Sequence, residues 1–269
     1  MKLLKHTGVV IALSLFASQI ATAEVHNAQD IAKKLANPIS ALISLPMQLN
    51  YAQGYGANDD GEQYLLNVQP VIPISLNDEW NVISRTILPI VRRDDIPTGS
   101  DVQNGIGDIV QSLFFSPKEP TQSGWIWGVG PVFMFPSGTN DLSIEKWSAG
   151  PTAVALKQDG PWTYGGLANH IWSVGGSDDV IEDISQSFIQ PFVSYSTPKG
   201  LTYTVMTEST YDWEGEQWSV PIHLVATQLG KIGNQMISYG GGIHYWAESP
   251  EGGPEGFGVR LVFTLLWPK

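Results

Sequence analysis

The C-terminal stretch GFGVRLVFTLLWPK, residues 256–269, decides the fold of this chain. From Phe257 to Trp267 every second residue is apolar, and Arg260 and Thr264 stand between them. A period of two places alternate side chains on opposite faces of a β-strand. The stretch therefore predicts a strand with one apolar face, formed by Phe257, Val259, Leu261, Phe263, Leu265 and Trp267.

Eleven segments further upstream show the same period and are separated by clusters of Gly, Asn, Asp and Pro. Short alternating segments with turn residues between them are typical of antiparallel strands. We therefore expect twelve strands, at residues 43–51, 64–74, 80–91, 108–116, 125–135, 147–156, 162–173, 187–195, 201–211, 218–227, 236–246 and 257–267.

The connections between these strands alternate between long and short, so the two kinds leave the sheet by opposite ends. The six long connections hold 19 of the 26 acidic residues and three basic ones, Arg92, Arg93 and Lys146. The charges of the five short turns cancel. One rim of the fold is therefore predicted to be strongly acidic and the other neutral.

Residues 1–23 read as a secretory signal peptide, because a basic start is followed by an apolar run and a small-residue site at Ala21-Thr22-Ala23. The apolar run from Val9 to Ile20 is too short to cross a bilayer as a helix. The exported chain has no cysteine and must fold without disulfides. The formal charge of the full sequence, −12, argues against nucleic acid as a partner.

Aromatic residues gather at the ends of the predicted strands, where the two interfaces of a bilayer favour amphipathic rings. A soluble β-sandwich would also alternate, but it needs neither an even number of strands nor aromatic belts. Residues 41–269 are therefore predicted to form an all-β fold: a single closed antiparallel transmembrane β-barrel of about 12 strands in the outer membrane of a Gram-negative bacterium. The end residues are Trp80, Trp125, Trp147, Trp162, Trp218, Trp246 and Trp267 with Tyr51, Tyr64, Tyr195 and Tyr203.

The last strand is expected to close the barrel against the first, and its aromatic end resembles the signal read by the barrel assembly machinery. Pro268 and Lys269 follow that aromatic residue, which departs from the usual pattern. Before the barrel, residues 24–40 form an N-terminal segment in which residues 27–36 have helical spacing before Asn37-Pro38. This short helix is either a lumen plug or a periplasmic lead-in.

Four stretches resemble a bacterial outer-membrane family: residues 37–46, 67–73, 80–89 and 107–109. The family is labelled transporter or "MetA pathway of phenol degradation" protein, and its members are sometimes misnamed neuromedin U. The resemblance covers residues 37–269. It implies a channel for small solutes, including hydrophobic or aromatic compounds, and it transfers no functional residues.

Charged side chains within the strands are expected to face the lumen, because a charge facing lipid near the bilayer centre costs roughly 2–4 kcal/mol. Arg85, Glu208, His223, His244 and Arg260 are the candidates that line or constrict a pore. A buried ion-pair network that simply fills the lumen is the alternative. The sequence predicts no cofactor and no enzymatic activity.

Two other classes of function are alternatives. A barrel hydrolase acting on lipid would need a serine beside a positioned histidine, and His170 with Ser173 is a candidate besides His223 and His244. Alternatively, a structural or adhesive barrel could bind divalent cations that bridge to lipopolysaccharide phosphate. Its carboxylates would come from Asp178, Asp179, Glu182 and Asp183.

Overall fold

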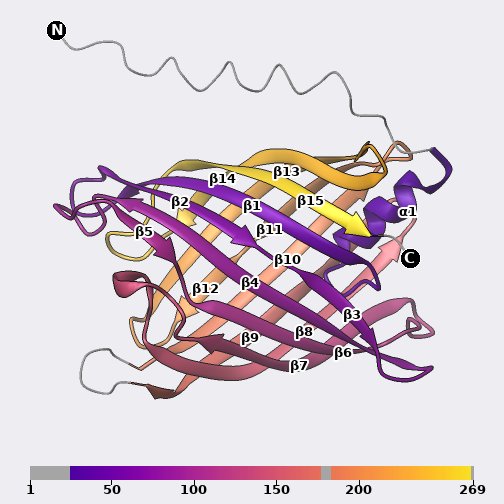
Figure 1. Cartoon of the computed structure of the whole chain (residues 1–269), viewed down its shortest axis with the longest axis horizontal. Coiled ribbons are helices and arrows are strands. Elements are labelled where there is room, and N and C mark those ends of the chain that lie inside the picture. The colour runs from indigo at the N-terminus through magenta and orange to yellow at the C-terminus, as the bar shows by residue number, and fades with distance from the viewer. Residues whose placement is uncertain (1–24, 177–182, 268–269) are drawn as a thin grey trace, which may run out of the picture.

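The computed structural model describes residues 25–176 and 183–267, which form a barrel with one α-helix at its end (Figure 1). The helix α1 spans Val25–Ala36, and a single 3-10 turn, η1, spans Asn140–Leu142. The strands within the described residues are β1 (Ile43–Tyr55), β2 (Gly61–Val68), β3 (Val71–Ser75), β4 (Trp80–Asp94), β5 (Gln103–Ile106), β6 (Ile109–Pro117), β7 (Trp125–Phe135), β8 (Lys146–Asp159), β9 (Trp162–Gly176), β10 (Ser185–Ser196), β11 (Leu201–Thr207), β12 (Ser209–Asp212), β13 (Gln217–Ile232), β14 (Gln235–Glu248) and β15 (Phe257–Trp267).

The described strands form one closed antiparallel barrel. β15 pairs with β1 over nine residue pairs, from Ile43 opposite Trp267 to Tyr51 opposite Val259, and this pairing closes the ring. Three passes are interrupted, so that β2 with β3, β5 with β6, and β11 with β12 each make one crossing. In the described part of the chain the barrel therefore has twelve strands, as the sequence predicts.

Most strands run past their predicted ends on the side of the long connections. β1, for example, continues from Tyr51 to Tyr55 because residues 52–55 still pair with β2 around a bulge. The interruption between β2 and β3 lies at Gln69-Pro70, and proline has no backbone N–H to donate to a neighbouring strand. Pairing beyond the alternating core of a strand is not visible in its hydrophobic period.

The last strand confirms the predicted division of faces. Phe257, Val259, Leu261 and Trp267 are exposed on the outer wall, whereas Arg260 is buried. Thr264 and Leu266 are buried as well, so the inner face becomes apolar near the end of the strand. The alternation therefore divides an outward apolar face from an inward, mostly polar one.

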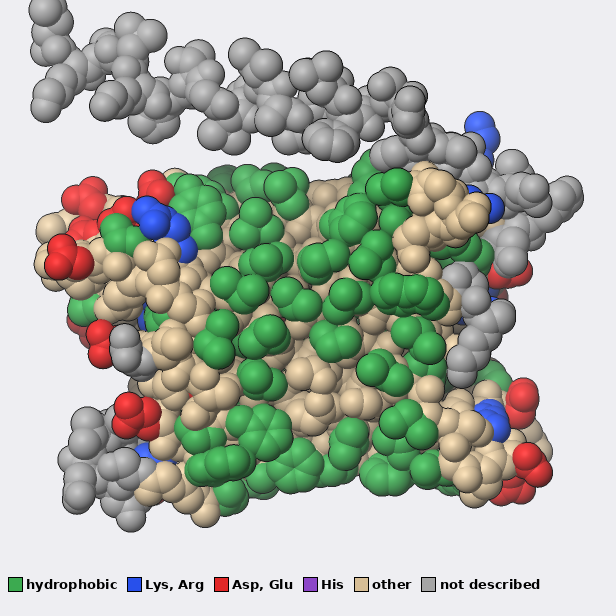
Figure 2. Space-filling view, in the orientation of Figure 1, with side chains coloured by type: hydrophobic (Ala, Val, Ile, Leu, Met, Phe, Trp, Pro, Cys, Tyr) green, Lys and Arg blue, Asp and Glu red, His purple; other side chains and the backbone are tan. Residues whose placement is uncertain are grey.

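The outer wall is apolar around the barrel, and Figure 2 shows hydrophobic side chains covering the face between two ends that carry the charged groups. Aromatic side chains pair at both ends of the strands: ring centroids lie 4.9 Å apart in Trp162–Tyr195 and 5.6 Å apart in Phe135–Trp147. Among residues 25–176 and 183–267, no helix has the length and apolar character needed to cross a membrane.

The two ends of the barrel differ, as predicted. We call the end with the long connections, such as 95–102 and 249–256, the loop end, and the other, where α1 and Trp267 lie, the turn end (Figure 1). One predicted rim carboxylate is in fact structural. Asp108 is buried and accepts hydrogen bonds from Gly138 N (2.9 Å), Ser143 Oγ (2.7 Å) and Ile144 N (2.7 Å), which fixes loop 136–145.

The helix α1 packs inside the turn end of the barrel. Its Ala28, Ile31 and Ala32 are buried in a cluster with inward side chains of β13 and β15, including Leu229 and Leu266. Two hydrogen bonds add to this packing, from Gln29 Nε2 to Ser196 O at 2.7 Å and from Gln158 Nε2 to Lys33 O at 2.8 Å. The helix therefore lies within the lumen at this end.

A second apolar cluster fills the opposite side of the lumen beside the helix. Ile39 follows α1 and packs against Ile83, Phe114 and Leu156, all of which are almost fully buried. The open space that remains at this level lies between α1 and strands β1, β3, β4, β10, β11, β13, β14 and β15.

Candidate functional site in the barrel lumen

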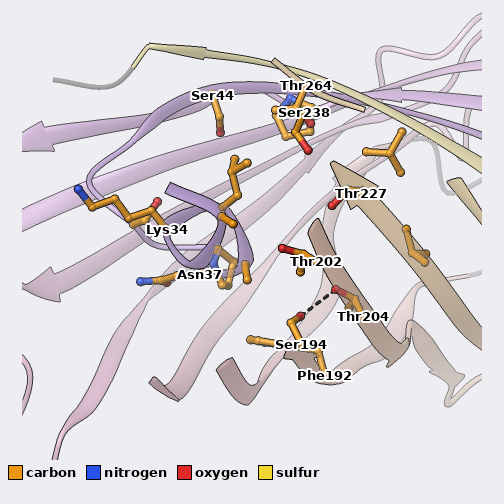
Figure 3. A pocket seen from close by; sticks show the side chains of 18 of the residues that line it. Lys34, Asn37, Ser44, Phe192, Ser194, Thr202, Thr204, Thr227, Ser238 and Thr264 are labelled. Carbon is orange, nitrogen blue, oxygen red and sulfur yellow. Dashed lines mark hydrogen bonds between the residues drawn. The ribbon is translucent and has the colours of Figure 1, made fainter. Parts of the chain in front are cut away.

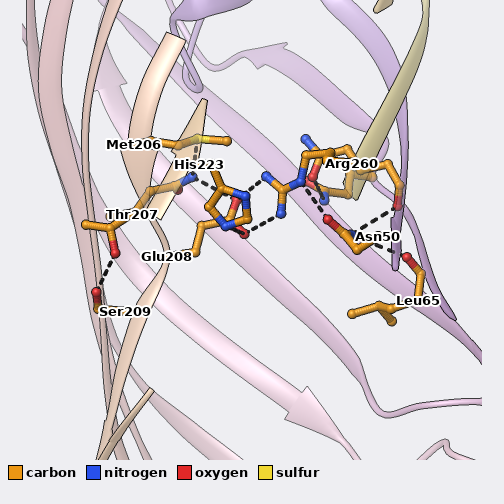
Figure 4. A network of polar contacts seen from close by, with 11 residues as sticks. Asn50, Leu65, Met206, Thr207, Glu208, Ser209, His223 and Arg260 are labelled. Carbon is orange, nitrogen blue, oxygen red and sulfur yellow. Dashed lines mark hydrogen bonds and ion pairs between the residues drawn. The ribbon is translucent and has the colours of Figure 1, made fainter. Parts of the chain in front are cut away.

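The centre of the lumen contains one buried ion pair that joins strands on two sides of the barrel. Arg260 on β15 donates from Nη1 to Glu208 Oε1 at 3.0 Å and from Nη2 to Glu208 Oε2 at 2.7 Å (Figure 4). Glu208 lies at the break between β11 and β12, and its side chain is 24% exposed, against 3% for Arg260. Two parallel charge-assisted hydrogen bonds make a guanidinium–carboxylate pair rigid as well as strong.

A third residue fixes the guanidinium from the first strand. Arg260 Nε donates to Asn50 Oδ1 at 2.6 Å, and Asn50 Nδ2 in turn donates to Leu65 O at 3.3 Å (Figure 4). Asn50 and Arg260 are direct partners in the pairing of β1 with β15. The strand pairing that closes the barrel therefore also positions the ion pair.

Two histidines extend this network along neighbouring strands. His223 and His244 face each other across β13 and β14, with ring centroids 5.1 Å apart, and both are 2% exposed. His223 Nε2 lies 3.6 Å from Glu208 Oε2. Gly258 makes room for His244, because a Cβ at this glycine would overlap His244 Nε2 and the carbonyl oxygen of Tyr51.

Trp246 is a correction to the predicted aromatic belt. Its indole packs edge-on against His244 with centroids 5.9 Å apart, and its Nε1 is buried. Trp246 pairs with Pro221 in the same unbroken register that pairs His244 with His223, so Trp246 shares the inward side with His244. The belt prediction rested on the position of Trp246 at a strand end, whereas the period of two already places it on the face of His244, two residues earlier.

Arg85 lies apart from the ion pair, on β4. Its Nη2 donates to Gln69 Oε1 at 3.0 Å, and Gln69 Nε2 donates to Gln48 Oε1 at 3.1 Å. Among the described residues no carboxylate forms an ion pair with Arg85. The guanidinium therefore keeps most of its hydrogen-bond donors available in the lumen.

Arg85, Arg260 and α1 border a cavity of about 220 Å³ (Figure 3). The C-terminal part of α1 and Asn37 form its floor at the turn end. Its wall is rich in hydroxyl groups, whose side chains surround the space in Figure 3: Ser44, Ser194, Thr202, Thr227, Ser238 and Thr264.

No family model matches this chain, and no curated protein matches it. A solved outer-membrane protein shares the fold. The "COG4313 outer membrane channel from Pseudomonas putida F1" is 14% identical, with a TM-score of 0.66, over 84% of this chain and 96% of that chain. The low-pH structure of Pseudomonas putida OprB is 6% identical over 92% of this chain and 100% of that chain, but its TM-score of 0.27 is too low to indicate a shared fold.

The five lumen candidates from the sequence all lie inside the barrel, and four of them, Glu208, His223, His244 and Arg260, form one network. Sequence reasoning missed their neutral partners Asn50 and Gln69. Both residues stand on the polar faces of their predicted strands, so the alternation contained a signal for their direction. It contained none for their partners, because partners depend on strand register.

His170 and Ser173, the candidate pair for a hydrolase, do not bond each other. His170 shares the outward side of β9 with Trp172, and its Nδ1 lies 2.7 Å from Ser187 Oγ on β10. Ser173 instead donates to Asp183 Oδ1 at 3.1 Å. Residues an odd number of positions apart on a strand, such as His170 and Ser173, point to opposite faces. Ser187, in contrast, is the direct cross-strand partner of His170.

Of the carboxylates considered for cation binding, Asp178, Asp179 and Glu182 lie outside the described residues. Asp183 forms a 3.4 Å ion pair with Lys146, besides its bond to Ser173. In the described part of the chain no group of three or more His, Asp or Glu residues is arranged to hold a metal ion.

Proposed function

We propose that this protein is an outer-membrane β-barrel channel for small solutes. The observation that carries this proposal is the opposite character of the two faces of one closed barrel. The outer wall exposes large apolar side chains, among them Ile72, Ile74, Leu224 and Phe257, while the lumen contains an ion pair, imidazoles and hydroxyl groups. A polar cavity inside an apolar wall fits a route through a membrane.

A bilayer is the partner that the outer wall requires. Soluble monomers rarely expose continuous apolar patches larger than a few hundred Å². Here exposed apolar residues occur on strands all around the barrel, from Leu49 on β1 to Leu261 on β15. The aromatic pairs at both strand ends fit the two interfaces of such a bilayer. Lipopolysaccharide is proposed to surround the loop end, where divalent cations would have to bridge its phosphates to acidic loops.

The Glu208–Arg260 pair and α1 are proposed to control passage. The pair crosses the lumen from the β11–β12 break to β15, so a solute must pass beside it. The helix occupies the turn end, so a solute larger than water must displace it or move around it. These two elements make the route narrow and selective.

Membership of the "MetA pathway of phenol degradation" type, and with it passage of hydrophobic or aromatic compounds, is part of the same proposal. Its support is the resemblance of residues 37–46, 67–73, 80–89 and 107–109, together with the fold shared with a solved outer membrane channel. Residues 1–23 are proposed to direct export, and Phe257–Trp267 to be recognised by the barrel assembly machinery.

The test is single-channel conductance of the refolded protein in a planar bilayer, beside liposome uptake of small neutral solutes. We expect small discrete conductance steps for the full exported chain and larger steps when residues 25–36 are deleted. Ile31→Glu should also enlarge the steps without shortening the chain, because it places a charge on a helix side chain that is 5% exposed. Asp30→Asn, on the exposed side of the same helix, is the matched control.

Absence of conductance and of uptake in all four proteins would refute the channel. A wild-type conductance that neither the deletion nor Ile31→Glu changes would refute the role of α1 alone. Both outcomes require that far-ultraviolet circular dichroism and heat-dependent gel mobility show a folded barrel.

A further inference from the structure

The lumen cavity has charges of one sign only. Its charged lining residues within the described part of the chain are Lys34, Arg85 and Arg260, and no carboxylate of that part lines it. Arg260 is compensated by Glu208, which stands beyond the cavity wall. Glu208 also attracts Arg85 through space, although Arg85 hydrogen-bonds only the neutral amide of Gln69. Two guanidinium groups and one carboxylate therefore leave a net positive charge beside the cavity.

A cation without a counter-charge inside a protein is costly unless water or an anion solvates it. The guanidinium group suits a carboxylate better than other small groups, because its donors match the two oxygens side by side. The wall adds hydroxyl donors. Those of Ser44, Thr227 and Ser238 have no hydrogen-bond partner among residues 25–176 and 183–267 and are free to bond a solute.

The remaining wall is apolar and limits the size of the ligand. Phe192, Val225 and Val262 line the same space, which suits a compact hydrocarbon body. The volume of about 220 Å³ lies below the roughly 300–1,000 Å³ of pockets for drug-sized ligands. The occupant that fits is therefore a small molecule with one anionic end and one apolar end.

We infer that this cavity is a binding site for a small organic monocarboxylate, with Arg85 as the residue that pairs with its carboxylate. The inference rests on the proposed function, because it names the solute class for the same lumen. The acidic rim does not oppose binding at this site. The rim belongs to the loop end, beyond the Glu208–Arg260 pair, and exposed charges are screened within about 8 Å at physiological salt.

The test compares two probes of the same shape, benzoate and its neutral amide, benzamide. Binding to the full exported chain in lipid nanodiscs is measured by ligand-observed NMR titration. We expect benzoate to bind at least about tenfold more tightly than benzamide, the difference between a charge-assisted and a neutral hydrogen-bonded contact. Arg85→Gln should bring this ratio close to one, and Arg85→Lys should keep part of it.

Arg92→Gln is the matched control. Arg92 is half exposed at the loop end and lies 3.8 Å from Asp94, so its loss should leave the ratio unchanged. Equal binding of the two probes, no binding of either, or a ratio that survives Arg85→Gln would overturn the inference. If Arg85→Gln fails to fold, the benzoate-to-benzamide ratio of Arg85→Lys still tests the inference.

Uptake of a neutral solute separates this inference from the channel itself. If glycerol enters liposomes at the same rate with wild type and Arg85→Gln but benzoate is not preferred, the channel stands and the carboxylate site is wrong. If benzoate binds through Arg85 but nothing passes through the barrel, the site stands and the proposed channel is wrong.

Discussion

Breaking the Glu208–Arg260 pair should destabilise the barrel strongly, while removing both charges should not add to the damage. Glu208→Gln leaves the guanidinium of Arg260, 3% exposed, without its counter-charge. Losing one partner of a buried pair costs about 3–5 kcal/mol. We expect about 3 kcal/mol, the lower end of this range, because Glu208 is 24% exposed and lumen water can replace part of the interaction.

Arg260→Met should cost a similar amount by leaving Glu208 unpaired. The double variant Glu208→Gln/Arg260→Met removes both charges and should cost no more than either single change. The coupling free energy between the two sites would then be about 3 kcal/mol, the upper end of values for residues in contact.

The assay is reversible urea unfolding in lipid vesicles, followed by the fluorescence of the ten tryptophans. Arg92 and Asp94 supply a matched control cycle, because this pair is about half exposed and should couple by less than about 1 kcal/mol. If Glu208→Gln and Arg260→Met were each nearly neutral, or if their effects simply added, the pair would not hold the lumen together and our reasoning would be refuted.

Four further predictions concern the wall, the lumen and the loops. Leu261→Arg should cost roughly 2–4 kcal/mol in the same unfolding assay, whereas Leu261→Ala should cost much less, because only arginine places a charge in lipid; equal costs would contradict a membrane-facing wall. Gly258→Ala should cost about 2 kcal/mol through the overlap of its Cβ with His244, and adding His244→Ala should recover part of this loss; an alanine variant as stable as wild type would disprove the tight fit. A fluorogenic phospholipid should not be hydrolysed, and turnover that disappears in His170→Ala would instead establish a hydrolase. Removing divalent cations with EDTA should leave protease cleavage at the loop end unchanged, and a change that Asp183→Asn abolishes would support cation binding there.

The number of strands and the direction of most side chains could be predicted from the sequence, because both depend on local alternation. Arg260 on β15 illustrates this point. Its apolar neighbours Val259 and Leu261 fix it on the inward face, whatever strand lies beside it. The same reasoning placed His223 and His244 inside. The belt prediction for Trp246 was wrong because it used the position at the strand end, whereas alternation places Trp246 on the inward face with His244.

The partners of these side chains were decided only by the tertiary structure. Glu208 and Arg260 are 52 residues apart, and Asn50 and Arg260 are 210 residues apart. The alternation of the sequence indicates that each of these side chains points inward. It does not indicate the height along the barrel or the strand toward which the side chain points. That depends on the register of every hydrogen-bonded strand pair between them and on how the ring closes.

The position of α1 was likewise decided only by the tertiary structure. The sequence predicts a short helix before the barrel and leaves open whether it enters the lumen. Its buried face, with Ala28 and Ile31, packs against Leu229 and Leu266. These two residues lie together only because β13, β14 and β15 pair side by side. Local alternation determined the faces of this protein, whereas closure of the sheet determined its contacts, because a strand's period is local and its register is set by the whole ring.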